Sequence, residues 1–488
     1  MRGEVHLSAQ FQPLKSITFV LLRFCAVVLA ASLASCEMAL VENQPTGFSA
    51  ESSRLILYAH LTSQPVKEIV FTIDDLALET ADGRVVKVLD SPVDVSSFVL
   101  ATGQMLLKEA AIPPGEYTGL RIRFSKATIR RSDGRMNLAL PEGATTVIKT
   151  RIDMKRASSF VVSIGWDSEN SIEKAFRFQP TMVAEAQEPS STGLLLLVSN
   201  SGSNYISVID RSLERVIAAI TVGDKPMGMA LNPAQDTIYV VNSGSRTLSV
   251  VEAAHLDVLD VIPLTAGIGP TDVVFLPDTD ISLHGKLYVI NRLSNDVSVI
   301  NTITRRIKKL IPVGLAPSAI AVDTQRREVY VANERSNSLS IINTVDDTVA
   351  STVPVDKRPS GIVLGVDKIY VLNQGSAMIT IVSPSTRAAI GSIPLAEPPR
   401  RGMKGFDGRL FIANATDSIT FLNSGDVVTR TIPSGPAPFG MAGDERRGRV
   451  YVTNSRADAV ELVEPFGEKV VKRLFVGPKP YGLVSLER

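Results

Sequence analysis

The sequence contains very little cysteine and histidine for its length. Its 488 residues include two cysteines, Cys25 and Cys36, and four histidines. Because both cysteines lie near the N-terminus, neither a disulfide framework nor a cysteine metal site is available to the rest of the chain.

An excess of charge of either sign is also lacking. The chain has 51 basic and 50 acidic residues, a formal net charge of +1. A protein that binds DNA or RNA along a long footprint needs a basic field, so we exclude nucleic acid as a partner. The hydrophobic content of 44% is ordinary for a globular protein, and the length suggests two or three domains.

The N-terminus has the pattern of a secretory signal. Lys15 and Arg23 precede an apolar run from Phe24 to Leu33 that ends in small residues, and the run is too short to span a bilayer. We therefore expect an exported protein whose signal peptide occupies residues 1–35.

The last four residues of this signal, Leu33-Ala34-Ser35-Cys36, resemble the bacterial lipobox. The resemblance implies cleavage before Cys36, a lipid on its thiol and a membrane anchor, followed by a tether over residues 36–52. Glu37 is not the aspartate associated with inner-membrane retention, so an outer-membrane location is expected if the cell has two membranes. The alternative is an ordinary signal peptide, or an uncleaved anchor, with a chance cysteine.

Residues 53–187 are predicted to form a β-sandwich. Segments such as RLILYAHLT and TGLRIRFSKATIRR alternate apolar and polar residues with period two, and Gly and Pro clusters separate them. An antiparallel sandwich is the simplest interpretation. Trp166, the single tryptophan, is either a core residue or a platform on which a sugar stacks.

Three stretches of this segment resemble a domain of unknown function that is common in bacterial lipoproteins and similar to transthyretin-like or carbohydrate-binding sandwiches. They are IVFTIDDLAL, IPPGEYTGLRIRF and SIGWDSENSIEKAFRFQP. These motifs are structural, and the resemblance implies no chemistry.

A short motif of the YVxN kind recurs seven times between residues 193 and 488. Its closing asparagines, spaced 40 to 49 residues apart, are Asn200, Asn242, Asn291, Asn333, Asn373, Asn414 and Asn454. A period near forty with strand-like content fits one four-stranded propeller blade per repeat. The chain is thus predicted to be all-β, with an N-terminal β-sandwich followed by a seven-bladed β-propeller.

Proline and glycine place the strands within each repeat. Prolines such as Pro263 and Pro312 end one strand of the repeat, which suits a strand at the outer edge of a sheet. Prolines such as Pro226 and Pro317 begin another strand, whose small residues suit the crowded axis. Because the last element, YGLVSL, is of this axial kind, we expect it to close the ring beside the first repeat.

These repeats match the YVTN-repeat propellers of exported bacterial and archaeal proteins. The resemblance implies the fold and is nearly silent on function. Related propellers include lactonases, quinone-cofactor dehydrogenases and haem-d₁ nitrite reductases. Downstream of Cys36, however, only His60, His255 and His284 are present, and no GxSxG elbow occurs.

We therefore predict no catalytic residue, no metal and no cofactor. The favoured function is a binding or scaffold lipoprotein of the cell envelope that acts through the propeller loops. An envelope enzyme of the lactonase or quinoprotein kind is the alternative. Expected partners are the membrane, through the lipid, and an envelope protein, a glycan or a small anionic ligand.

The candidate ligand-binding residues lie on loops or axial strands of the repeats. Asp272 and Arg401 place charge where other repeats have small or apolar residues, which suggests a ligand contact or an internal ion pair. Four further candidates are basic: Lys225, Arg358, Arg400 and Lys479. Acidic neighbours offset much of this charge, so a solvated rim of mixed charge is the other interpretation.

The third repeat is the longest, and the extra residues include Asp278, Asp280 and His284. A metal site or an elongated surface turn would account for them. With no second histidine nearby, we favour the turn.

Overall fold

The computed structural model describes residues 52–187, 193–278, 284–405 and 407–487. Cys36, the predicted signal peptide and most of the predicted tether lie outside these residues. Both regions described below belong to one compact unit, Phe48–Arg488. We refer to residues 52–187 as the N-terminal region and to residues 193–487 as the C-terminal region.

Two sheets build the N-terminal region, and short elements lie between their strands. The β1 sheet has the order β12 (Thr181–Ala186), β9 (Ser159–Asp167), β1 (Ser53–Leu61), β5 (Met105–Ile112). The β2 sheet contains β3 (Val85–Lys87), β2 (Ile69–Glu79), β6 (Gly115–Arg131) and β7 (Gly134–Asn137), with β4 (Val93–Ser96) on β2 and β8 (Thr145–Met154) on β6. The short elements are α2 (Ser97–Ala101), η1 (Glu142–Ala144), η2 (Glu169–Ser171), β10 (Ile172–Glu173) and β11 (Arg177–Phe178).

A shared core joins the two sheets and contains Trp166. This side chain is 1% exposed, its ring meets Phe71 edge-on at 4.8 Å, and its Nε1 donates to Ser171 Oγ at 2.9 Å. Trp166 is a core residue, so the sugar-platform interpretation is wrong. β1 is buried on both faces: Leu55 and Leu57 belong to this core, whereas Ile56 and Tyr58 belong to a cluster shared with the C-terminal region.

One pair of strands departs from the expected antiparallel arrangement. β1 pairs in parallel with β9, with Leu55 opposite Phe160, and antiparallel with β5. A parallel neighbour requires a long connection, and about a hundred residues separate these two strands. Alternation within a strand cannot reveal such a pairing, because both directions produce the same period.

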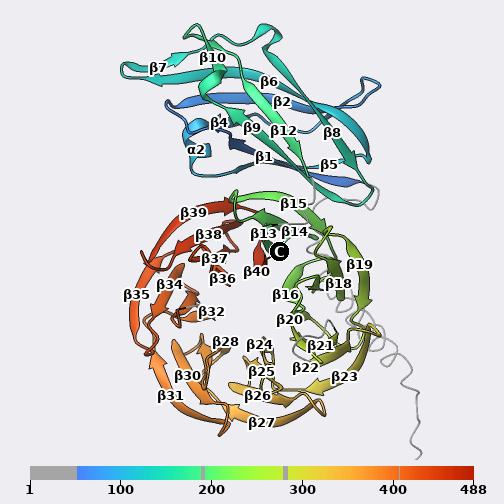
Figure 1. Ribbon diagram of the computed structural model, residues 1–488, viewed down its shortest axis with the longest axis vertical. Coiled ribbons are helices and arrows are strands. Elements are labelled where there is room, and N and C mark those ends of the chain that lie inside the picture. Colours follow the sequence, from blue (N-terminus) through green and yellow to red (C-terminus); the bar gives the residue numbers. More distant parts are fainter. Residues whose placement is uncertain (1–51, 188–192, 279–283, 406, 488) are drawn as a thin grey trace, which may run out of the picture. The chain divides into compact units, whose positions relative to one another are not determined.

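Seven four-stranded sheets make up the described C-terminal region, and Figure 1 shows them arranged around a centre. From the centre outward, sheet I is β40 (Pro480–Glu487), β13 (Leu194–Asn200), β14 (Tyr205–Asp210), β15 (Arg215–Thr221); sheet II is β16 (Pro226–Leu231), β17 (Thr237–Asn242), β18 (Thr247–Glu252), β19 (Val258–Pro263); sheet III is β20 (Pro270–Pro277), β21 (Gly285–Asn291), β22 (Asp296–Asn301), β23 (Arg306–Pro312); sheet IV is β24 (Pro317–Asp323), β25 (Glu328–Asn333), β26 (Ser338–Asn343), β27 (Thr348–Pro354). Sheet V is β28 (Pro359–Leu364), β29 (Ile369–Asn373), β30 (Met378–Ser383), β31 (Ala388–Pro394); sheet VI is β32 (Pro399–Lys404), β33 (Leu410–Asn414), β34 (Ser418–Leu422), β35 (Val428–Pro433); sheet VII is β36 (Pro438–Asp444), β37 (Arg449–Asn454), β38 (Ala459–Glu464), β39 (Lys469–Phe475).

The repeated asparagines are buried, and in six of the seven sheets the asparagine bridges two strands of its own sheet. Asn242 Nδ2 donates to Ser249 Oγ at 2.9 Å, and the same bond recurs in sheets I and III to VI. In sheet VII Glu461 replaces the hydroxyl residue; it is 1% exposed and accepts bonds from Gly435 N and Arg473. The repeat period therefore reflects a buried polar contact that sheets I to VI form, whereas in sheet VII Asn454 Nδ2 has no hydrogen-bond partner among the described residues.

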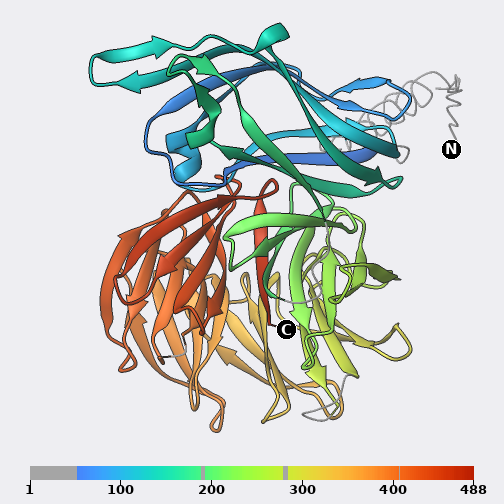
Figure 2. The same cartoon turned by 45° about the horizontal axis from the view of Figure 1, so that its top comes forward.

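The strand order agrees with the proline pattern. Strands that end in proline, such as β19 and β23, are outermost, where a missing N–H breaks no ladder. The C-terminal strand β40 pairs with β13, with Leu486 opposite Leu195, and it is the red strand near the centre in Figure 2. The region is all-β and consistent with a β-propeller.

Candidate functional site

The loops that follow the repeated asparagines lie on the same face as the loops before the axial strands. Backbone bonds join the two sets: Ser243 N donates to Lys225 O, Gln374 N to Arg358 O and Ser201 N to Lys479 O, at 2.9 to 3.0 Å. We call this face the loop face. At its centre the axial strands begin, so side chains there come from different sheets.

Three of the predicted basic residues occupy the same position of this turn. Lys225, Arg358 and Lys479 each precede the proline of an axial strand with φ of +52° or +53°. Lys225 and Lys479 are exposed, and Arg358 forms an ion pair with Glu334 at 2.8 Å. The fold spaces them around the face, so they do not converge on one point.

The structure brings Asp272 and Arg401 together, although they lie on β20 and β32. Arg401 Nη2 is 3.4 Å from Asp272 Oδ2, and it also donates to Ser318 O at 2.9 Å and Tyr481 Oη at 3.3 Å. Nη1 donates to Ser360 O at 2.8 Å. The guanidinium therefore links four other axial strands, which makes the pair an internal ion pair.

Burial and charge oppose one another in this cluster. Burial raises the pKa of Asp272, and the neighbouring Arg401 lowers it by a smaller amount. For Arg401, burial opposes the charged form, but Tyr481 and Asp272 together outweigh it, so the pKa of Arg401 is raised. The Arg401 guanidinium is therefore already bonded to its neighbours and has few donors left for a ligand.

Arg400 differs from its neighbour. Its guanidinium lies 6.0 Å from the Phe439 ring centroid, the Phe439 ring packs on Tyr481 at 4.2 Å, and among the described residues no hydrogen bond or ion pair satisfies it. Burial lowers the pKa of Arg400, Arg456 lowers it further, and Asp417 raises it by a smaller amount. Arg456 is itself paired with Asp417 at 3.0 Å.

Among the described residues, Arg400 is thus a half-buried cation at the mouth of the axis that forms no hydrogen bond or ion pair. We call Arg400, Phe439, Tyr481 and Arg456 the mouth cluster. A guanidinium presents a planar fork of donors that matches carboxylate, sulfate or phosphate, and partial burial strengthens such a contact. The arrangement can bind an anion beside an aromatic surface.

Sequence reasoning identified Arg400 but missed Phe439 and Tyr481. The residue after each axial proline is Met227, Thr271, Ser318, Ser360, Arg400, Phe439 or Tyr481 in the successive repeats. Alignment of the repeats would have shown that the large cationic and aromatic members are consecutive, and hence adjacent around the axis.

The elongated turn of sheet III is only partly described. Residues 279–283, including Asp280, lie outside the described residues, whereas Asp278 N donates to His284 O at 3.0 Å across the base of the turn. Among the described residues no group of three or more His, Cys, Asp or Glu side chains could hold a metal. In the same part of the chain, no helix is long and apolar enough to cross a membrane.

Comparison with known proteins supports the propeller and goes no further. No family model matches the chain. Over 133 residues it is 29% identical to a seven-bladed β-propeller protein of Mycobacterium tuberculosis, a match that covers 26% of this chain and 32% of that protein. The chain thus spans about a third of the length of the relative that it matches.

Two solved structures show the same fold at low identity. A functionally unknown protein from Desulfotomaculum acetoxidans has a TM-score of 0.54 at 12% identity, and the match covers 60% of this chain and 99% of that chain. A candidate 6-phosphogluconolactonase of Bacteroides fragilis has a TM-score of 0.51 at 10% identity, covering 60% and 98%. At such identities the likeness concerns the fold alone.

Proposed function

We propose that the chain is an exported lipoprotein of the cell envelope that binds a small anionic ligand at the loop face of a seven-bladed β-propeller. In this proposal β40 closes the ring, a β-sandwich spans residues 53–187, and the propeller spans residues 193–488. A lipid on Cys36, after removal of residues 1–35, holds the protein to the membrane, and residues 36–52 are the tether.

The unpaired Arg400 carries the proposal of an anionic ligand. The cost of leaving a half-buried cation without a partner falls when an anion occupies the site. Phe439 and Tyr481 line the same place and would contact an apolar or aromatic part of the ligand. Asp272 and Arg401 hold the axial strands in position beneath it.

A binding role fits this site better than the enzyme alternative. Near the mouth cluster, the described residues Asp272, Arg401 and Tyr481 contact one another. Catalysis would require a group poised to exchange a proton or attack a substrate, and no observation at the mouth cluster favours one.

Calorimetric titration of the detergent-extracted full chain with inorganic phosphate, sulfate and benzoate tests the ligand class. We expect at least one anion to bind with 1:1 stoichiometry, and Arg400→Gln to weaken it at least tenfold. Arg306→Gln, an exposed arginine on β23, is the matched control. Anion binding that is unchanged in Arg400→Gln would refute the site, and co-purification of a protein or glycan on the loop face would favour the scaffold form of the hypothesis.

Intact-mass analysis of the natively expressed protein tests the anchor. A mass that corresponds to residues 36–488 plus a lipid supports lipidation of Cys36. An unmodified thiol, or an uncleaved N-terminus, refutes it without affecting the anion site.

A further inference from the structure

The N-terminal region covers the outer edge of sheet I with two glutamine side chains. Gln104 Oε1 accepts from Val216 N at 2.8 Å while its Nε2 donates to Val216 O at 3.1 Å. Gln187 makes the same pair of bonds to Ala219, at 3.0 and 3.3 Å. Each amide thereby takes the place of a neighbouring strand on β15, which would otherwise expose an unpaired edge.

Apolar contacts complete this junction. Ile56, Tyr58 and Val161 of the β1 sheet share one buried cluster with residues of the C-terminal region, among them Ala219 and Val476. Edge bonds and a common core fix the two regions against each other here. A cavity along the junction is therefore a preformed feature, in the kind of place where binding pockets are often found.

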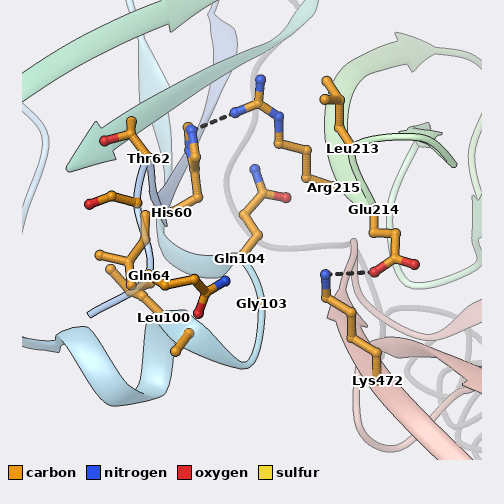
Figure 3. A pocket seen from close by; sticks show the side chains of 13 residues that line it. His60, Thr62, Gln64, Leu100, Gly103, Gln104, Leu213, Glu214, Arg215 and Lys472 are labelled. Atoms are coloured by element: carbon orange, nitrogen blue, oxygen red, sulfur yellow. Dashed lines mark hydrogen bonds and ion pairs between the residues drawn. The ribbon is translucent and has the colours of Figure 1, made fainter. Parts of the chain in front are cut away.

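A cleft of about 320 Å³ lies beside these glutamines, between the end of β1, the α2 turn and the Leu213–Arg215 turn. Figure 3 shows Thr62 and Gln64 on one side of it and Glu214 and Lys472 on the other. Leu61, Leu100 and Leu213 add apolar surface. Gly103, with φ of +154°, permits a close approach, since a Cβ there would lie 3.2 Å from Arg473 O.

The charged groups at the cleft are matched in pairs. Glu214 and Lys472 form an ion pair at 2.8 Å, and Arg215 pairs with Glu185 at 2.7 Å. Arg215 also donates to His60 Nε2, and burial, aided by Arg215, lowers the pKa of His60 to about 4, so the imidazole is neutral at pH 7. With its charges balanced, the cleft favours neither an anion nor a cation.

The polar side chains that line the cleft can still donate and accept hydrogen bonds. The Thr62 hydroxyl and the Gln64 amide each donate and accept, and neither side chain bonds to another described residue. Glu214 still has an acceptor oxygen and Lys472 still has donors, because only one bond joins them. A ligand hydroxyl, which also donates and accepts, matches such a lining.

We propose that this cleft is a second binding site, which takes a neutral polyhydroxylated molecule of monosaccharide size. The site needs both regions of the chain, because Thr62 and Gln64 come from one and Glu214 and Lys472 from the other. It is separate from the mouth cluster in position and in ligand charge.

Calorimetric titration with glucose, galactose, N-acetylglucosamine and maltose tests this site. The full chain is used in a detergent without a sugar head group, since such a head group would compete. We expect at least one sugar to bind with 1:1 stoichiometry, and Thr62→Val/Gln64→Leu to weaken it at least tenfold. Gln374→Leu, the same change on the loop face, should leave the affinity unchanged.

Two results would overturn the proposal: no sugar of the panel binds, or the double variant binds as tightly as the wild type. Arg400→Gln separates this site from the anion site. Sugar binding that persists in Arg400→Gln supports the cleft, whereas sugar binding lost with Arg400 would place the sugar at the mouth cluster and refute the cleft.

Discussion

Sheet I is held by Arg211, Asp444 and Glu487 on one side and, at its outer edge, by Gln104 and His60 of the N-terminal region; we call these residues the seam. The seam and the mouth cluster both contain arginine, but the arginines have different surroundings. At the seam Arg211 and Asp444 are both fully buried, 2.9 Å apart, and Arg211 also donates to Leu486 O and Glu487 of β40. At the mouth Arg401 and Asp272 remain 14% and 23% exposed, and Arg400 beside them lacks a partner. Buried charges that are paired, such as Arg211 and Asp444, stabilise the fold. A partly exposed charge without a partner, such as that of Arg400, can bind a ligand.

Removal of the buried seam arginine should have the largest effect. Arg211→Met leaves Asp444 buried without its counter-ion and frees β40, so we expect a loss of about 3–5 kcal/mol in the free energy of unfolding. Urea unfolding of the full chain measures it. Arg211→Met/Asp444→Leu should regain part of the loss, and equal stability of the single variant and the wild type would show that the seam does not depend on this pair.

Loss of an edge-covering amide should come next. Gln104→Leu leaves the N–H and C=O of Val216 without partners, an expected cost of about 1–3 kcal/mol. Gln64→Leu, an exposed glutamine of the same region, should change stability by less than about 0.5 kcal/mol. Identical unfolding midpoints for the two variants would contradict the role of Gln104 as a substitute strand.

The mouth pair should tolerate truncation better than the seam pair. Arg401→Met removes bonds to two carbonyls and to Asp272, but water reaches this site, so we expect a loss of about 1–2 kcal/mol. Urea unfolding provides the comparison with Arg211→Met. A loss as large as that of Arg211→Met would mean that the mouth is as dry as the seam.

Protonation of His60 at acid pH should lower the free energy of unfolding. Its pKa in the folded protein is lowered to about 4 from the ordinary 6.5, by burial first and by Arg215 second. Between these values the unfolded chain binds the proton more readily, so stability falls as the pH drops from 6.5 towards 4. His60→Gln should flatten this part of the stability profile, and a profile parallel to that of the wild type would exclude His60 as a cause.

The smallest stability change is expected at Arg400. Arg400→Gln removes a cation that has no partner and lies near Arg456, so the free energy of unfolding should stay within about 0.5 kcal/mol of the wild type. The same variant loses anion affinity in the proposal above. A marked loss of stability would instead assign Arg400 a structural role.

Local pattern predicted much of the C-terminal region and little of the seam. The YVxN asparagines form bonds within one sheet, such as Asn242 to Ser249, so a short window of sequence contains both partners. Arg211, in contrast, looks like an ordinary turn residue. Its partners Asp444 and Glu487 are more than two hundred residues away.

The residues of the candidate sites also differ in how far the sequence predicted them. Asp272 and Arg401 were identified because they broke the repeat, yet their separation of 3.4 Å follows from the arrangement of the axial strands. Gln104 and His60 carried no signal, because a glutamine that covers a strand edge and a histidine that accepts from an arginine need no motif around them. Trp166 left two interpretations open until the burial of its ring was known.

Periodicity and composition alone specify an all-β chain with a repeating four-stranded unit, because alternation and repeat length are properties of neighbouring residues. They also specify a balanced charge and a chain nearly free of cysteine. Contacts between distant segments specify the parallel β1–β9 pair, the buried Arg211, the unpaired Arg400 and the cleft at Gln104. These features depend on which surfaces exclude water, and that is settled when segments far apart in sequence come together.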